Sequence, residues 1–371
     1  MLKVTLNSLF FKRIQTILNF NTKFKIRYHI SNVHLNEHSS WDSKEKIFCP
    51  FAEHTRRRPN KISIIGIGNV GQAILAGLLF QKVTDNIAFH DLNEQKVKGE
   101  LLDFQYSGLY STNVEIQGST DLDVITDSRI VVITASARRQ ENDTKVQLVK
   151  KNVEVFQKLI PQIVKRAPNA VLLLVTNPVE IMTYVTVKLS GLPPGQVLGS
   201  GTNLTTSRLL FYVSQKYNVA ADSCQGWVIG EHGESAVTAF STITVGGCFI
   251  KDINKNIGKE DDDENWSEFH RLVLEIPAKV ISMKGYTNWA IGFSVANIAY
   301  TIITNNKTIH PVTVLAKGFC GIKKDVYLSL PAVLGENGVV EIVRLVLTKE
   351  EGNLLIKSEK SLHAIQRKIK L

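Results

Sequence analysis

Short apolar segments alternate with amphipathic ones from about residue 60 onward. Runs such as "KISIIG" and "VLLLV" have the length and the unbroken apolar character of strands buried on both faces. The longer segments between them carry apolar residues at helical spacing, and Pro161 predicts a kink in one of them. This alternation predicts an α/β fold with parallel strands. The predicted strands are 61–66, 86–91, 129–137 and 170–178, and the predicted helices are 72–81 and 147–166.

The pattern becomes mixed beyond about residue 200, where helical segments are interspersed with strand-like ones. This half therefore predicts a mixed α+β domain. The acidic run "KEDDDE" at 259–264 predicts a solvated surface turn, and no internal repeat is found. The predicted helical regions are 206–217, 265–305 and 349–369, and the predicted β-rich segments are near 225–250, at 311–334 and at 338–347.

Length and cysteine spacing narrow the class of protein. A chain of 371 residues has room for two domains or one large one. No apolar stretch approaches 18 residues, so we expect no membrane span. The four cysteines form no C-x-x-C motif, which favours a reduced compartment and predicts neither a metal site nor a disulfide framework. These cysteines are Cys49, Cys224, Cys248 and Cys320.

The net charge of +10 comes mostly from the first 36 residues. This leader holds six basic side chains and no Asp or Glu, which leaves only +4 for the other 335 residues, so we expect no nucleic-acid partner. Basic, acid-free and roughly amphipathic, residues 1–36 have the composition of a mitochondrial transit peptide. The alternative is a disordered or subunit-clasping arm on a cytoplasmic protein. The six basic residues are Lys3, Lys12, Arg13, Lys23, Lys25 and Arg27.

The stretch "GIGNVG" carries a dinucleotide-binding pattern. It follows a predicted strand and opens a predicted helix, and Asp91 lies at the end of the next strand, twenty residues after Gly71. In this pattern the first glycine permits a tight turn, the second lets the backbone approach a pyrophosphate, and the third lets helix pack on strand. Asp91 would accept hydrogen bonds from ribose hydroxyls and repel a 2′-phosphate, which favours NAD over NADP. The predicted cofactor-binding residues of the loop are Gly66, Gly68, Asn69, Val70 and Gly71.

This motif predicts that the first domain is a Rossmann doubly wound parallel sheet that binds NAD. The alternative is a glycine turn in an α/β domain that has no ligand. A second candidate is His232 in "VIGEHGES", at the end of an apolar run. A lone histidine beside a strand is more often a hydrogen-bonded structural residue, so His232 by itself does not predict catalysis.

From about residue 60 to the C-terminus the sequence resembles the L-lactate/malate dehydrogenase family, most closely the L-lactate dehydrogenases. The resemblance implies a Rossmann domain at 58–201, a mixed α+β catalytic domain of the lactate/malate dehydrogenase type at 202–371, and an N-terminal leader or arm at 1–57. It also implies a homotetramer, with a dimer as the alternative. The matching stretches are "GIGNVGQA", "NPVEIMTYV", "LGSGTNL", "WVIGEHGES", "KGYTNWAIG", "HPVTVLAKG" and "LPAVLGENG".

The resemblance also implies roles for individual residues. His232 corresponds to the acid/base, which takes the hydroxyl proton as hydride leaves a 2-hydroxy acid. Arg208 corresponds to the arginine that binds the substrate carboxylate through its planar fork. Without its match to the family pattern, Arg208 would be better interpreted as part of a salt bridge on a helix surface. Asn177 corresponds to a residue near both nicotinamide and substrate, and we predict a cis peptide bond between it and Pro178.

Two further positions correspond to binding residues of the family. Thr287 matches a residue that lines the substrate pocket, and Arg138 one that contacts the cofactor. In the segment "RRQENDTK", Arg139 occupies the specificity position, where lactate enzymes carry glutamine and malate enzymes carry arginine. Thr287, by contrast, is typical of the lactate enzymes. The two specificity signals therefore conflict.

Two catalytic positions depart from the family pattern. Thr205 stands where an aspartate normally orients the histidine, and a hydroxyl supplies no charge to stabilise a protonated imidazole. Lys145 stands where an arginine normally polarises the substrate carbonyl, so the charge is kept but the planar fork is lost.

Three functional hypotheses remain. The first is an active NAD-dependent oxidoreductase that interconverts an L-2-hydroxy acid and its 2-oxo acid. The substrate pair expected first is L-lactate and pyruvate. The second is a catalytically weakened or inactive NAD-binding protein, which the substitutions at Thr205 and Lys145 favour. The third is a structural or scaffold role, for which the sequence offers no trace.

Overall fold

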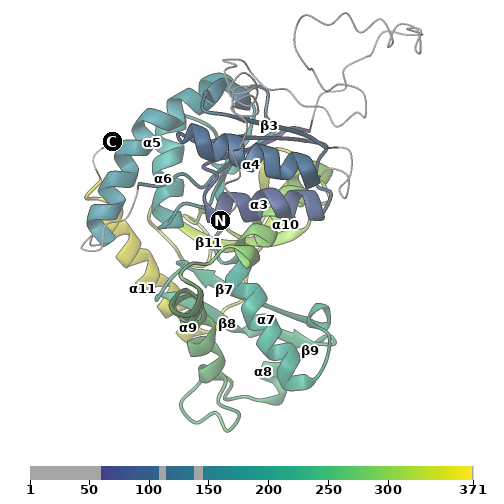
Figure 1. The fold of residues 1–371 in the computed structure, drawn as a ribbon. Helices are drawn as coiled ribbons and strands as arrows, with labels where there is room; N and C mark the ends of the chain where they lie inside the picture. The colour runs from purple at the N-terminus through teal and green to yellow at the C-terminus, as the bar shows by residue number, and fades with distance from the viewer. Residues whose placement is uncertain (1–59, 108–113, 138–144, 370) are drawn as a thin grey trace, which may run out of the picture.

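One continuous mixed sheet forms the centre of the molecule (Figure 1). The computed structural model describes residues 60–107, 114–137, 145–369 and 371. Its strands follow the order β3-β2-β1-β4-β5-β6-β10-β11-β7-β8-β9, and β12 pairs with β11. The first six are mutually parallel in the order 3-2-1-4-5-6, which is that of dinucleotide-binding Rossmann folds. Among the described residues, no helix has the length and apolar character needed to cross a bilayer.

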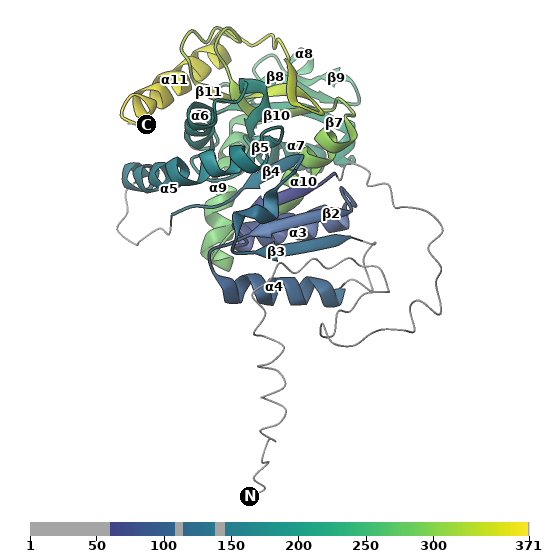
Figure 2. The same cartoon turned by 90° about the horizontal axis from the view of Figure 1, so that it is seen from above.

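The parallel half has helices on both faces, because its strand order runs outward in two directions from β1 and β4. Accordingly, α5 and α6 lie on the side away from α4 (Figure 2). The central strands β1, β4 and β5 are buried along their whole length, as their unbroken apolar runs predict. The elements are β1 (Ile62–Ile65), α3 (Asn69–Phe80), β2 (Asn86–His90), α4 (Glu94–Tyr106), β3 (Glu115–Ser119), η2 (Leu122–Ile125), β4 (Ile130–Ile133), α5 (Lys145–Arg166), β5 (Val171–Leu174), α6 (Val179–Ser190), η3 (Pro194–Gln196) and β6 (Val197–Gly199).

The strands of the second half are antiparallel, and they join the parallel strands of the sheet where Thr313 on β10 pairs with Gly199 on β6. Its lower lobe contains α7, α8, α9, β8 and β9 (Figure 1). The elements are α7 (Asn203–Tyr217), η4 (Ala221–Ser223), β7 (Cys224–Gly230), β8 (Ala236–Val245), β9 (Cys248–Phe249), α8 (Ile250–Ile253), α9 (Trp266–Lys284), α10 (Trp289–Thr304), β10 (Ile309–Leu315), β11 (Tyr327–Gly335), β12 (Gly338–Ile342) and α11 (Lys349–Gln366).

Several predicted boundaries are corrected by the structure. The helical region 265–305 consists of α9 and α10, because the chain turns at Gly285, whose φ is +91°. The strand-like run 311–334 consists of β10 and β11, which pair with each other in antiparallel register. α5 continues through Pro161 as one helix, and the kink predicted at this residue stays a prediction. The cis peptide bond predicted between Asn177 and Pro178 is confirmed.

Two hydrophobic cores hold the parts of the molecule together. The larger one lies around the parallel strands and extends to β10, β11 and α11. The smaller one fills the lower lobe around the fully buried Trp266. Leu209 and Val213, one turn apart on α7, belong to this smaller core, so the opposite part of the same helix is available to the site.

Close packing of α10 on α3 brings the segment before α10 to the start of the sheet. A Cβ on Gly292 of α10 would lie 2.5 Å from the backbone carbonyl of Ala73 on α3, so only glycine allows this approach. The packing places Thr287, two residues before α10, beside the glycine-rich loop that precedes α3.

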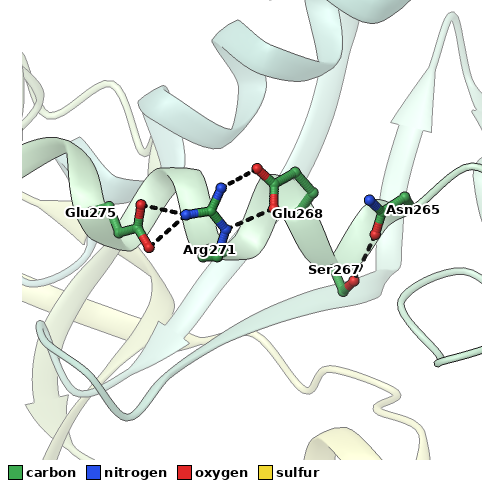
Figure 3. Close-up of polar contacts among 5 residues, drawn as sticks. All are labelled: Asn265, Ser267, Glu268, Arg271 and Glu275. Carbon is green, nitrogen blue, oxygen red and sulfur yellow. Dashed lines mark hydrogen bonds and ion pairs between the residues drawn. The ribbon is translucent and has the colours of Figure 1, made fainter.

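The exposed face of α9 carries an ion-pair chain (Figure 3). Arg271 bonds Glu268 one turn before it and Glu275 one turn after it, with its Nη1 2.6 Å from Glu275 Oε2. Ser267 also donates to the Asn265 side chain, at 3.0 Å. Because these groups are exposed and screened by water, we expect each pair to contribute little to the stability of the fold.

The acidic run before α9 is less solvated than predicted. Asp262 is buried, and its carboxylate accepts hydrogen bonds from the backbone N–H groups of Gly258, Glu264 and Trp266. Burial by itself would raise the pKa of Asp262, but a bond from the Asn254 side chain and these backbone bonds together lower it. The prediction of a solvated turn is therefore wrong at Asp262, whose buried carboxylate accepts the N–H of Trp266, the first residue of α9.

Candidate functional site

The glycine-rich loop leads from β1 into α3 with little room for side chains. Gly66 has a φ of +95°, and its N–H donates to the His90 carbonyl at 2.7 Å. A Cβ on Gly71 would lie 2.1 Å from the carbonyl oxygen of Gly66, so no other residue fits there. A Cβ on Gly68 would meet no atom within 4 Å. Gly68 therefore leaves open space directly at the start of α3.

This open space belongs to a cavity of about 1050 Å³, which lies at the carboxyl ends of the parallel strands. The structure brings seven of the predicted site residues to its wall, although they come from three separate parts of the chain. The cavity also extends along α5 to Lys158 and Arg166. The seven residues are Gly66, Gly68, Asn69, Val70, Gly71, Asp91 and Thr287.

The residues present fit a dinucleotide. The backbone N–H groups at the start of α3 receive no side-chain cap, so together with the helix dipole they can bind a pyrophosphate over Gly68. Asp91 lies on the same cavity wall at the end of β2. Its carboxylate also accepts from the N–H groups of Ile67 at 2.9 Å and Asn93 at 3.0 Å. Asp91 thus holds the glycine loop against β2 while keeping lone pairs for a ribose hydroxyl.

A second group of predicted residues gathers between α7 and the end of β7. His232 follows β7 and is half-buried, and Thr205 and Arg208 lie one turn apart on α7. The Thr205 hydroxyl lies 3.3 Å from His232 Nδ1. Burial and the neighbouring positive charge of Arg208 lower the pKa of His232 to about 4. The imidazole is therefore neutral at neutral pH.

The Thr205 hydroxyl holds the imidazole only loosely. A hydroxyl can either donate to Nδ1 or accept from it, so it selects one tautomer less strongly than a carboxylate, which only accepts. When Nδ1–H donates to Thr205, Nε2 has a free lone pair and can act as a base. The neutral Thr205 hydroxyl then supplies no negative charge to stabilise the imidazolium that results.

Arg208 is half-buried beside His232, and burial lowers its pKa. Within the described ranges, no carboxylate pairs with its guanidinium. A half-buried cation of this kind is a ready site for a planar anion.

Two residues that sequence reasoning missed also shape the site. Asn152 of α5 is buried; its side chain accepts from the Ala137 N–H at 2.7 Å and donates to the Asn177 carbonyl at 3.1 Å. It thereby ties the segments after β4 and β5 together. Glu180, in the first turn of α6, accepts from the backbone N–H of His232 at 2.8 Å. The sequence signal for Glu180 is a charged residue in the apolar first turn of the helix that follows "NP".

The other predicted site residues lie outside the two groups described above or outside the described ranges. Arg138 and Arg139 lie outside the described residues, and Lys145 is the first residue of α5. Asn177 is exposed at the end of the segment after β5, and it does not line the large cavity. Within the described ranges, no three His, Cys, Asp or Glu residues are grouped as metal ligands would be.

The fold and the glycine-loop cavity define a dinucleotide-binding protein of the Rossmann class. Residues 60–199 match the model of the lactate/malate dehydrogenase NAD-binding domain, and residues 202–370 match that of the lactate/malate dehydrogenase α/β C-terminal domain. The chain belongs to the lactate/malate dehydrogenase family, and its cofactor is NAD.

Similar proteins include L-lactate dehydrogenases from vertebrates. The B chain from Bos taurus is 43% identical over 328 residues, which cover 88% of this chain and 98% of that protein. The A chain from Danio rerio is 40% identical over 330 residues, which cover 89% of this chain and 99% of that protein.

We expect Asp91→Ala to weaken NADH binding at least tenfold, or about 1.4 kcal/mol, and NADPH binding by less than threefold. The variant loses an acceptor for the ribose hydroxyls, and it also loses the charge that repels a 2′-phosphate. Titration calorimetry with both cofactors measures the difference. Because Asp91 also bonds Ile67 and Asn93, the Tm of the variant is the control for loop damage. Equal losses for the two cofactors would contradict the role of Asp91 in selectivity.

Proposed function

We propose that this protein is an NAD-dependent oxidoreductase that interconverts L-lactate and pyruvate. The observation that carries the proposal is the pair formed by His232 and Arg208: a half-buried imidazole beside a half-buried guanidinium that no described carboxylate neutralises. Such a pair can bind the carboxylate of a small 2-hydroxy acid and remove a proton from its hydroxyl.

In this mechanism Arg208 binds the substrate carboxylate through two parallel N–H groups. His232 then accepts the hydroxyl proton at Nε2 during oxidation and returns it during reduction. The glycine loop and Asp91 would hold NAD, which would supply the hydride acceptor for this reaction. Asn177 and Thr287 orient the substrate, and Lys145 places positive charge near the carbonyl oxygen. Arg139 contacts the group that distinguishes one 2-oxo acid from another.

For the cofactor site, we propose that the backbone of Gly66, Gly68, Asn69, Val70 and Gly71 binds the pyrophosphate. Asp91 accepts from the adenosine ribose, Arg138 contacts the phosphates from the segment after β4, and Asn177 contacts the nicotinamide side. The open space over Gly68 and the uncapped start of α3 support this assignment.

The second candidate is a catalytically weakened or inactive NAD-binding protein. The observation in its favour is the 3.3 Å contact between His232 and Thr205, which supplies no charge to the imidazolium. The two candidates bind NAD alike and differ in turnover alone.

We expect the pure protein to oxidise NADH in the presence of pyruvate faster than with oxaloacetate or longer 2-oxo acids. The measurement is the loss of NADH absorbance at several substrate concentrations. NADH binding without turnover on any 2-oxo acid would support the inactive alternative. A folded protein that binds no NADH would contradict both candidates.

We further propose a division into an NAD-binding domain at 58–201 and a catalytic domain at 202–371, which the two family-model matches support. We propose a homotetramer as the assembled state, with a dimer as the alternative. Large exposed apolar side chains, among them Phe80 and Met283 at 79% each, support association. Sedimentation equilibrium distinguishes the two states.

The location that we propose is the cytoplasm, or the mitochondrion if residues 1–36 act as a transit peptide. The acid-free, basic composition of this segment supports the second location. A fluorescent reporter fused to residues 1–45 distinguishes them.

A further inference from the structure

Glu180 is a fully buried acid that the proposed mechanism does not use. It lies in the first turn of α6, three residues after Asn177, and its side chain has no exposed surface. Its Oε1 accepts the backbone N–H of His232 at 2.8 Å. Its Oε2 has no hydrogen-bond partner in the part of the chain that the structure describes.

The complete burial of Glu180 and the unpartnered Oε2 are both explained if the carboxyl group is uncharged. Burial and, more weakly, the negative charge of Glu231 raise the pKa of Glu180 to about 8, against the opposing effects of the His232 and Glu180 backbone N–H groups. The nearby Ser329 hydroxyl also opposes the shift, but it hydrogen-bonds Thr313 and leaves Oε2 without a partner. At neutral pH the group is therefore a protonated acid. A neutral carboxyl still accepts one backbone hydrogen bond, and it avoids the cost of an unpaired buried charge.

The backbone anchor matters because the imidazole itself is held weakly. In the described part of the chain, the ring has a hydrogen-bond contact with the Thr205 hydroxyl at 3.3 Å, and this hydroxyl lacks the charge of a carboxylate. The loop that carries His232 begins after Gly230, whose φ is +90°, and turns back through a bond from Gly233 N–H to the Glu231 carbonyl. Between these two points, the bond to Glu180 determines where the His232 backbone lies.

We propose that Glu180 is a positioning residue for His232. Its carboxyl fixes the loop that carries the imidazole to the first turn of α6, and thereby sets the ring relative to Asn177 on the other side of the site. Glu180 takes no part in the proton transfer itself. The kinetic part of this proposal rests on the proposed function, whereas its structural part does not.

Three variants separate positioning from simple packing. Glu180→Gln keeps the size of the side chain and an oxygen that accepts from His232. Glu180→Leu keeps most of the volume but removes the acceptor. Thr186→Val is the matched control, because it removes another fully buried polar group from α6, a hydroxyl that donates to the Met182 carbonyl at 2.7 Å. All are made in the full-length chain.

The first measurement is hydrogen–deuterium exchange of the peptide 228–235, which contains the His232 amide. We expect Glu180→Leu to speed exchange of this amide at least tenfold, and Glu180→Gln and Thr186→Val to leave it within threefold of wild type. The second measurement is steady-state kinetics with NADH and pyruvate. Glu180→Leu should lower kcat at least tenfold while NADH affinity changes less than threefold, and Glu180→Gln should retain wild-type kcat within threefold.

The outcomes are distinct. Unchanged exchange in Glu180→Leu overturns the proposal, and so does an equal kcat loss in Glu180→Leu and Thr186→Val. If Glu180→Leu does not fold, Glu180→Asp replaces it: the shorter acid stays buried but withdraws its oxygen by one methylene, and the same faster exchange is expected. If wild type shows no turnover at all, the proposed function fails, while the exchange experiment still decides the role of Glu180.

Discussion

His232→Asn should lower kcat for both directions of the reaction at least 100-fold. Asparagine keeps a polar side chain of similar reach, but it neither accepts nor releases a proton near neutral pH. General acid–base catalysis contributes about 10²- to 10⁴-fold in enzymes, and the loss should fall within this range. The measurement is steady-state turnover with pyruvate and NADH, and with L-lactate and NAD.

The cofactor site provides the control for this variant. His232 does not line the glycine-loop cavity, so NADH affinity and Tm should remain close to those of wild type. A kcat for His232→Asn within threefold of wild type would show that another group moves the proton. In that case the assignment of His232 as acid/base would be wrong.

Thr205→Asp should raise kcat for pyruvate reduction at pH 7 at least tenfold. Reduction requires a protonated imidazole, and a His232 pKa of about 4 leaves about one ring in a thousand protonated at pH 7. A carboxylate in place of a hydroxyl 3.3 Å from Nδ1 stabilises the imidazolium and raises the pKa. The stabilisation acts in the transition state, so NADH affinity should change little.

The pH dependence gives a second test of the same variant. In wild type, the rate of reduction should rise as pH falls from 7 toward 4, because the acid form of His232 becomes more populated. The oxidation rate should follow the neutral form, so it should stay nearly constant and fall only as the pH approaches the pKa of about 4. In Thr205→Asp, the pH dependence of the reduction rate and that of the oxidation rate should both shift to higher pH. Ser207→Asp is the matched control, since it adds the same charge on the exposed side of α7.

Adding Lys145→Arg should bring a further gain in kcat. The planar fork of arginine can form two bonds to a polarised oxygen. We expect the double variant to exceed wild type at least tenfold, about 1.4 kcal/mol, with effects that are not additive because both residues act on one step. If the double variant matches a wild type that already turns over at ordinary dehydrogenase rates, Thr205 and Lys145 are functional variants. The weakened-enzyme hypothesis would then be wrong.

The sequence by itself determined the architecture of the first half. The apolar runs of β1, β4 and β5 predict strands buried on both faces, and such strands require helices on both sides of a parallel sheet. The glycine spacing of "GIGNVG" likewise predicts the loop, because backbone at Gly66 and Gly71 leaves no room for a Cβ. These features are local, so a short stretch of sequence contains them completely.

The second half was predicted less well because its strands depend on distant partners. The apolar run 311–334 does not show where the chain turns, and pairing between β10 and β11 settles that. Asp262 is likewise indistinguishable from its acidic neighbours until three backbone N–H groups converge on it. A charge pattern predicts exposure, and tertiary contacts alone decide which carboxylate is buried.

The site shows the same division. The sequence identified His232, Arg208 and the substitution at Thr205, because these residues lie within recognisable motifs. Only the tertiary structure brought Glu180 to the backbone of His232, 52 positions away along the chain. Residue type and spacing describe chemistry within one segment. Burial, and with it the neutral state of Glu180, arises where separate segments pack together and exclude water.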